Sequence, residues 1–217
     1  VQMRWSVDDY ASEATFRRRV FDLMEAVRAR LDPRWPALVA FPEDVGTPCL
    51  LMGEELGGTD DLAGAVSRLV RRQWPRLLLV RLLRRVGWVR AVALTRAGRT
   101  AAIYFRTFRE AARRFRVWLV AGSVLLPRLR AGRGGWVPVG RCVYNVSYLF
   151  GPQGEPLGRQ EKVHLIDLEG PRGLDLCPAP LAGLTVVPTP VGRVGIAICF
   201  DAFHEPVLQA LERQGVE

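Results

Sequence analysis

Short apolar runs separated by long arginine-bearing segments constrain the fold of this chain more than any other feature. Three runs, residues 37–41, 117–121 and 193–199, have the length and composition of buried strands. Residues 142–150 and 157–163 flank a Gly-Pro turn and predict a hairpin, and residues 186–192 predict an edge strand. Helices are expected at residues 8–31, 62–94 and 107–115. Helices and hairpins are mixed along the chain, which predicts an α/β or α+β class with a mixed sheet.

The size and composition of the chain fit one domain, residues 1–217. Apolar residues make up 49% of the chain and aromatic residues 9%, enough to form a buried core. Arginines interrupt every apolar stretch before it reaches 18 residues, so a membrane-spanning helix is not expected. The four cysteines include no CxxC pair, and we expect Cys49, Cys142 and Cys177 to pack passively as free thiols. With no visible leader segment, a cytoplasmic location is the default expectation.

The basic residues are unusual in kind and in distribution. The chain has 30 arginines and one lysine, Lys162. Residues 62–154 contain 19 arginines and a single acid, Glu110, for a net charge of +18. Such a segment could bind nucleic acid, anionic lipid or an acidic protein, but helices with arginines on their solvated faces are the better explanation. We therefore do not expect nucleic acid or a membrane as a partner.

Two chemically useful side chains lie at the ends of apolar strands. Cys199 ends the run 193–199 and precedes the start of a helix, a position where the helix dipole favours a thiolate nucleophile. Glu43 follows the run 37–41 and would lie at the same edge of the sheet, where it could act as a general base. A buried structural cysteine and a solvated loop carboxylate are the respective alternatives.

Lys162 is the one basic position at which the chain does not use arginine. A lysine ammonium is a compact point charge that can approach an oxyanion, whereas a guanidinium is a wide planar fork. Two rival readings of the site remain open. One is a Cys-His dyad in which His164 or His204 serves Cys199. The other is a metal site that uses Cys177, Cys199 and the two histidines, although their spacing matches no known metal motif.

Three segments together resemble the signature segments of the nitrilase, or carbon–nitrogen hydrolase, superfamily. They are FPED (residues 41–44), EKVHL (161–165) and VGIAICFD (194–201), and their order matches that of the family. The supporting stretches VAGS (120–123), YN (144–145), FGPQG (150–154) and FHEP (203–206) are also similar to it. The resemblance covers residues 37–48 and 108–214.

The resemblance implies a four-layer α-β-β-α sandwich, usually in homo-oligomers, and a Cys-Glu-Lys mechanism without metal or cofactor. Cys199 would be the nucleophile, Glu43 the base, and Lys162 with the backbone N–H of Phe200 the oxyanion donors. The family often has a second glutamate after the lysine; Glu169 is its best match and Asp175 a second candidate. The substrate would be a small amide, carbamoyl compound or nitrile. Transfer of the acyl group to an amine is an alternative on the same scaffold, and a non-catalytic binding protein that uses the basic segment is another.

Two departures from the family pattern accompany the resemblance. Residues 50–107 match no family segment, and we expect them to form an arginine-rich helical insertion. The family also continues with further strands and a helix past the position of residue 217, so the sandwich is expected to be incomplete at its C-terminal end.

Overall fold

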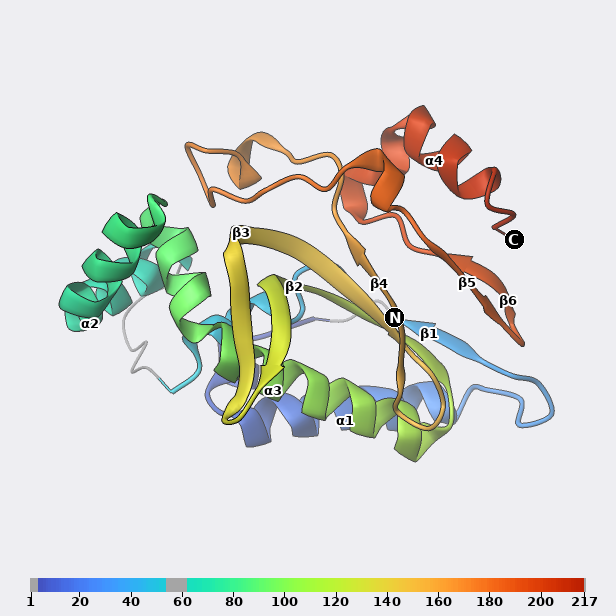
Figure 1. Cartoon of the computed structure of the whole chain (residues 1–217). Helices are drawn as coiled ribbons and strands as arrows, with labels where there is room; N and C mark the ends of the chain where they lie inside the picture. The colour runs from blue at the N-terminus through green and yellow to red at the C-terminus, as the bar shows by residue number, and fades with distance from the viewer. Residues whose placement is uncertain (1–3, 54–61, 217) are drawn as a thin grey trace.

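A mixed sheet with helices on one face forms the centre of the molecule (Figure 1). The computed structural model describes residues 4–53 and 62–216. The elements are, in order, η1 (Val7–Tyr10), α1 (Glu13–Arg28), β1 (Leu38–Ala40), η2 (Thr47–Leu51), α2 (Leu62–Arg84), α3 (Trp88–Phe115), β2 (Trp118–Gly132), β3 (Gly135–Phe150), β4 (Pro156–Glu161), η3 (Asp167–Glu169), η4 (Leu181–Gly183), β5 (Val186–Thr189), β6 (Gly192–Gly195), η5 (Cys199–Phe203) and α4 (Glu205–Glu212). The mixed α/β class predicted from the sequence is confirmed.

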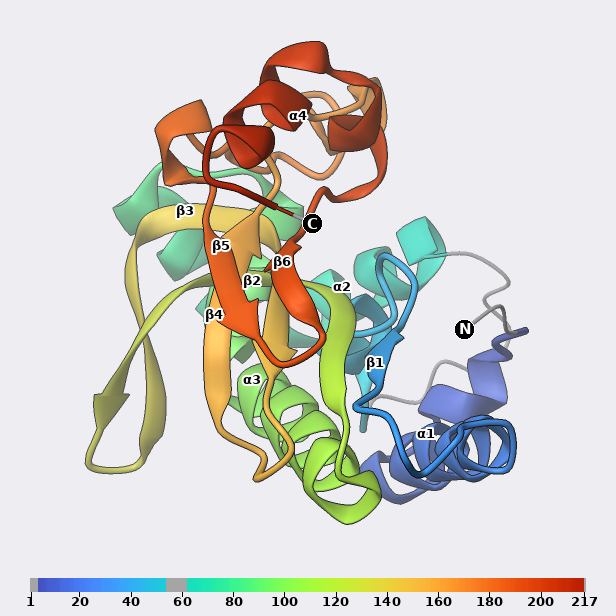
Figure 2. The same cartoon turned by 90° about the vertical axis from the view of Figure 1, so that its right-hand side faces the viewer.

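The main sheet has the strand order β1-β2-β3-β4, in which β1 pairs parallel to β2 and the other pairs are antiparallel. Helices α1 and α3 pack against each other on one face of this sheet (Figure 1). The main core lies between these helices and the sheet and contains four fully buried aromatic rings: Phe16, Tyr104, Phe108 and Phe150. The β5–β6 hairpin and α4 lie on the other side of the sheet (Figure 2). The outer half of a four-layer sandwich stays a prediction.

Strands β2 and β3 form a long antiparallel hairpin that the sequence did not indicate. The run 117–121 was expected to end at Gly122, but β2 continues to Gly132 through two register shifts. Gly122 adopts a φ of +67°, and a side chain there would collide with the Pro42 carbonyl and Val45. The bulge therefore lets β2 pass close to the loop that follows β1 without ending the strand.

The strand expected at residues 193–199 is shorter than predicted. Strand β6 spans Gly192–Gly195 and pairs with β5 along one edge; its other edge has no partner strand among the described residues. Residues 196–198 continue as extended chain outside the ladder, and most of β6 is only half-buried. The prediction of a buried strand over residues 193–199 was wrong in length and in burial: β6 ends at Gly195 and belongs to a two-stranded sheet whose residues stay partly exposed.

The arginine-rich segment divides into two environments. Helix α2 lies at one end of the molecule (Figure 1), is kinked at Gln73 just before Pro75, and packs against α3. Helix α3 runs unbroken from Trp88 to Phe115, and its second half belongs to the main core. At Gly98 an added side chain would lie 2.7 Å from the carbonyl oxygen of Trp136, so glycine permits the close approach of β3. Residues 54–61, part of the expected insertion, lie outside the described residues.

Part of the positive charge of residues 62–154 is balanced across the α1–α3 contact. Arg106 on α3 contacts Glu13 at 2.6 Å, and Arg114 contacts Glu25 at 2.9 Å. Arg17 on α1 pairs with Glu110 on α3. Each of these half-exposed pairs contributes at most about 1 kcal/mol. In the Arg106 and Arg114 pairs, acids outside the basic segment neutralise arginines within it, which weakens the argument for an acidic partner.

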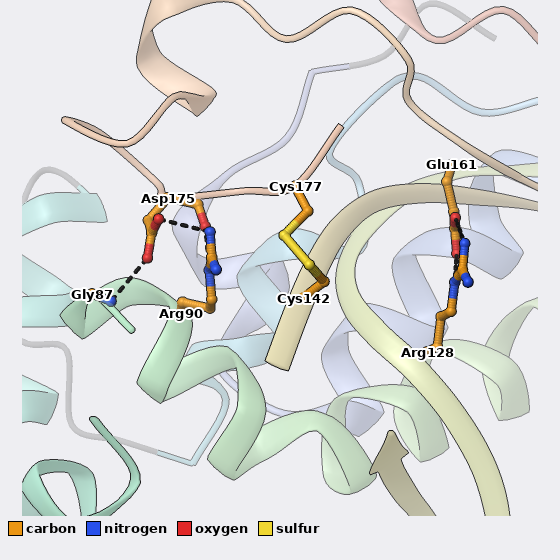
Figure 3. Close-up of a disulfide and its surroundings, with 7 residues drawn as sticks. All are labelled: Gly87, Arg90, Arg128, Cys142, Glu161, Asp175 and Cys177. Carbon is orange, nitrogen blue, oxygen red and sulfur yellow. Dashed lines mark hydrogen bonds and ion pairs between the residues drawn. A yellow bond between two sulfur atoms is a disulfide. The ribbon is translucent and has the colours of Figure 1, made fainter. Parts of the chain in front are cut away.

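A disulfide joins Cys142 on β3 to Cys177 in the loop between η3 and η4 (Figure 3). The two Cα atoms are 5.6 Å apart across a separation of 35 residues, and the Cys177 N–H donates to the carbonyl of Val143 at 2.8 Å. The expectation that these two cysteines pack as free thiols was wrong, because only the fold brings such distant residues together. The cytoplasmic expectation rested partly on unpaired cysteines and loses that support.

Reducing this disulfide is expected to lower the free energy of unfolding of the full-length protein by about 3–4 kcal/mol, because a loop of this length is no longer closed in the unfolded chain. Urea unfolding with and without a thiol reductant measures the effect. In the Cys142→Ser/Cys177→Ser double variant the reductant should change nothing. Equal unfolding midpoints for oxidised and reduced wild type would contradict the prediction.

Within the described parts of the chain, no helix combines the length and the apolar character needed to cross a membrane.

Candidate active site

Glu43 lies in a tight turn directly after β1. Asp44, the next residue, has a φ of +59°, and its backbone N–H donates to the Ser123 hydroxyl at 2.8 Å. The Gly46 N–H donates to the Ser123 carbonyl at 2.8 Å, and the Thr47 hydroxyl donates to the Asp44 carboxylate at 2.7 Å. The first residues of β2 past the bulge therefore hold this turn, which leaves the Glu43 carboxylate partly exposed at the edge of the sheet.

Lys162 follows β4 and has a side chain that is only 1% exposed. Its Nζ lies 2.8 Å from Oε1 of Glu43 and 2.8 Å from Oε2 of Glu169. Burial by itself lowers the pKa of the Lys162 ammonium, but the hydrogen bonds and charges of Glu169 and Glu43 more than offset burial, so the pKa is raised. The lysine is thus held as a cation between two carboxylates.

The second glutamate of the cluster is Glu169, on η3, rather than Asp175. Its Oε2 also accepts the backbone N–H of Ile166 at 3.0 Å, and the residue is 4% exposed. Asp175 lies elsewhere: its carboxylate pairs with Arg90 at 2.7 Å and accepts the Gly87 N–H at 2.8 Å, at the start of α3 (Figure 3). Asp175 therefore ties the Glu169 loop to the arginine-rich helices instead of joining the site.

Cys199 begins η5 with a φ of +46°, and its side chain is exposed. A hydrogen bond to the Glu43 carboxylate raises the pKa of the Cys199 thiol, and burial and the Glu43 charge raise it further. Lys162 and the backbone N–H of Phe200 act in the opposite direction but do not overcome this effect. The expectation that a following helix favours the thiolate was therefore wrong in direction: η5 is a single short turn, and Glu43 dominates.

The Cys199 and Lys162 segments are joined by a buried carboxylate, Asp201. It is fully buried, and its two oxygens accept the N–H groups of Val163 at 3.1 Å and His164 at 2.7 Å. The two residues that follow Lys162 are thereby fixed to the residue two positions after Cys199. This clamp sets the relative placement of the thiol and the ammonium.

The two histidines contact each other rather than forming a dyad with the thiol. The rings of His164 and His204 stack with centroids 3.6 Å apart, and Phe200 meets His204 edge-on at 4.6 Å. The group that most raises the pKa of the Cys199 thiol is the Glu43 carboxylate, not a histidine. Among the residues that the structure describes, no three His, Cys, Asp or Glu side chains are grouped to hold a metal ion.

A cavity of about 290 Å³ opens beside the thiol and the Glu43 carboxylate, between the main sheet and the β6 segment. Its wall combines apolar side chains with polar atoms that contribute nearly half of its surface, which suits a small polar molecule. The lining residues are Leu38, Ala40, Phe41, Glu43, Val120, Gly122, Ser123, Ser147, Val194, Gly195, Ile196, Ala197, Ile198 and Cys199.

Comparison with known proteins assigns the chain to a family. The model of the family described as carbon-nitrogen hydrolase matches residues 84–217, well over half of the chain. The deaminated glutathione amidase of Yersinia enterocolitica is 34% identical over 114 residues, covering 50% of this chain and 37% of that protein. The omega-amidase of Homo sapiens is 28% identical over 112 residues, again 50% of this chain and 37% of the relative.

The fold agrees with that of a solved relative. A carbon–nitrogen hydrolase from Helicobacter pylori G27 superposes with a TM-score of 0.59 at 16% identity, over 99% of this chain and 55% of that one. The mixed α/β fold of this chain is thus that of a known structural class. The chain belongs to the carbon–nitrogen hydrolase family, in the nitrilase superfamily. It spans about half the length of the solved Helicobacter protein.

Three of the four residues in the cluster lie within the range that the family model matches. Lys162, Glu169 and Cys199 lie within the matched residues, whereas Glu43 precedes them and is placed at the site by the fold. Residues 84–107, the second part of the expected insertion, also lie inside the matched region. Sequence reasoning gave no role to Asn145 or Asp201, although both stand in stretches that carried the resemblance; their burial is the signal that the structure adds.

The raised thiol pKa leads to a test that needs no substrate. The iodoacetamide reaction of Cys199 is expected to rise with pH to a midpoint above that of an ordinary thiol, about 8.5. In Glu43→Gln the midpoint should move to lower pH, because the carboxylate that stabilises the protonated thiol is gone. Cys49 will not interfere, since it is 1% exposed and burial raises the pKa of its thiol far above the ordinary value. An unchanged midpoint in Glu43→Gln would show that the two groups do not interact.

Proposed function

We propose that the full protein hydrolyses the carbon–nitrogen bond of a small amide through a thioester on Cys199. One observation carries the proposal: the Glu43 carboxylate lines the same cavity as the Cys199 thiol and lies 2.8 Å from the buried ammonium of Lys162. A candidate base, a nucleophile and a cation thus lie together beside a small cavity. The names of the curated relatives, both amidases, support an amide as the substrate class.

Acylation begins with the thiol proton. Glu43 takes this proton as Sγ attacks the carbonyl carbon, and the carbonyl π electrons move onto oxygen. The Lys162 ammonium and the Phe200 backbone N–H stabilise the resulting oxyanion. When the tetrahedral intermediate collapses, the carbon–nitrogen bond breaks, Glu43 returns the proton to the leaving ammonia or amine, and a thioester remains on Cys199.

Deacylation repeats the sequence with water as the nucleophile. Glu43 takes a proton from water as the hydroxyl attacks the thioester carbon, and the same donors stabilise the second oxyanion. Collapse breaks the carbon–sulfur bond and releases the carboxylic acid product, and Glu43 returns its proton to the departing sulfur, which restores the thiol and the carboxylate. Glu169 shares the charge of Lys162, which keeps the ammonium fixed during both halves of the reaction.

Ammonia release from a panel of short amides by the full-length protein tests this proposal. The wild type should release ammonia from at least one simple carboxamide, and Glu43→Gln should be nearly inactive on the same compound. Turnover by Glu43→Gln at the wild-type rate would overturn the mechanism, and the failure of wild type on every amide, carbamoyl compound and nitrile would overturn the function. Self-association, which the family resemblance implies, is checked by light scattering on the same sample.

A further inference from the structure

Asn145, on β3, contacts all three charged residues behind the thiol. It is fully buried, and its Nδ2 donates to Oε1 of Glu43 at 2.9 Å and to Oε1 of Glu169 at 2.9 Å. Its backbone carbonyl accepts the N–H of Lys162 at 2.9 Å. A side-chain amide has two N–H donors, and here each donor faces a different carboxylate.

The charge balance of the cluster explains why an amide suits this position. Glu43, Glu169 and Lys162 together carry one excess negative charge in a largely buried setting. A neutral donor between the two carboxylates reduces their repulsion without adding a cation that would compete with Lys162. The Oδ1 of Asn145 has no hydrogen-bond partner among the described residues, so the two Nδ2 bonds alone fix the orientation of the amide. A neutral side chain with two N–H donors at this position therefore satisfies both carboxylates.

The strand that carries Asn145 is linked covalently to the loop that follows Glu169. Cys142, three residues earlier on β3, is bonded to Cys177, in the loop that follows η3 (Figure 3). The Leu176 N–H donates to the Glu169 carbonyl at 2.9 Å, so the bridged loop also contacts the backbone of Glu169. The amide therefore has a fixed position relative to the carboxylate that it must orient.

We infer that Asn145 is a positioning residue of this site: its amide holds the Glu43 carboxylate toward Cys199 and keeps it apart from Glu169. A catalytic role for Asn145 rests on the proposed function, but its effect on the placement of Glu43 beside Cys199 does not. Asn145 acts through Glu43, so its removal should disturb the thiol only while Glu43 is a carboxylate.

The test measures the pH midpoint of Cys199 alkylation by iodoacetamide, which does not depend on turnover. Asn145→Leu has nearly the same size and no donor. Its midpoint should move to lower pH, toward that of Glu43→Gln, because a released Glu43 no longer stabilises the protonated thiol. The double variant Asn145→Leu/Glu43→Gln should show the midpoint of Glu43→Gln. If Asn145→Leu does not fold, Asn145→Ala is scored in the same way.

A matched control separates positioning from general loss of strand packing. Val143→Ala removes a fully buried side chain from the same strand, two residues away, without touching the carboxylates. It should lower thermal stability and leave the alkylation midpoint at the wild-type value. A wild-type midpoint in folded Asn145→Leu would overturn the inference, and so would an additional shift in the double variant.

Kinetics with an accepted amide add a second readout. Asn145→Leu should lower kcat about 100-fold, the usual cost of a misplaced catalytic group, with KM within about threefold of wild type. An unchanged kcat would contradict positioning. If wild type accepts no substrate, the proposed function fails by itself, while the alkylation experiment still decides the role of Asn145.

Discussion

Replacing Lys162 with methionine is expected to lower the free energy of unfolding by about 3–5 kcal/mol, the usual result of breaking a buried ion pair from one side. The ammonium is 1% exposed and lies 2.8 Å from each of two carboxylates, so its loss leaves Glu43 and Glu169 facing each other without a cation. Methionine has a similar length and fills the same space, so the variant removes charge with little loss of packing. Urea unfolding of the full-length protein measures the change.

A variant that keeps the positive charge identifies the cause of this instability. Lys162→Arg is the matched charge-retaining control. It should regain part of the stability but not the activity, because a planar guanidinium cannot replace a compact ammonium between two close carboxylates. A Lys162→Met variant as stable as wild type at neutral pH would contradict the electrostatic account of the cluster.

Replacing Cys199 with alanine is expected to reduce ammonia release by about 10⁴-fold or more, the scale of loss when a covalent nucleophile is removed. The side chain is exposed, so the unfolding midpoint should change little. Initial rates on an amide accepted by the wild type measure the effect.

Cys49→Ala is the matched control for Cys199→Ala. Cys49 lies on η2 in the main core, away from the site, so its loss should lower stability and leave the rate per folded molecule unchanged. Residual activity of Cys199→Ala within tenfold of wild type would assign the chemistry to another group.

Glu43 and Cys199 could be predicted from the sequence because each follows or ends an apolar run, and Lys162 because it is the one lysine among 31 basic residues. The structure brings Glu43 and Lys162 into contact and places Cys199 on the same cavity as Glu43. Glu169 required the family resemblance, since nothing local distinguishes it from Asp175. The direction of the thiol pKa could not be predicted, because it depends on a carboxylate 156 positions away in the chain, the difference between residues 199 and 43.

Features that arise from long-range packing were missed or misplaced. The strand at residues 117–121 was predicted too short because a glycine commonly ends a strand. At Gly122 the glycine is instead required by the close approach of Pro42 and Val45. Residues 88–115 were not predicted as one helix, because Gly98 and several arginines interrupt the apolar pattern. In the structure α3 is continuous and buries residues along its whole length. The Cys142–Cys177 bond spans 35 residues and has no local signature. In each case the decisive partner is distant in sequence.

Trapping the covalent intermediate tests the central claim most directly. The full-length protein is mixed with an accepted amide, quenched in acid within the first turnover, digested and analysed by mass spectrometry. We expect the acyl mass, the substrate less its amine, on the peptide that contains Cys199, with no such adduct in Cys199→Ala. Ammonia release accompanied by an acyl group on another residue, or by none under conditions where a control thioester survives, would contradict the account.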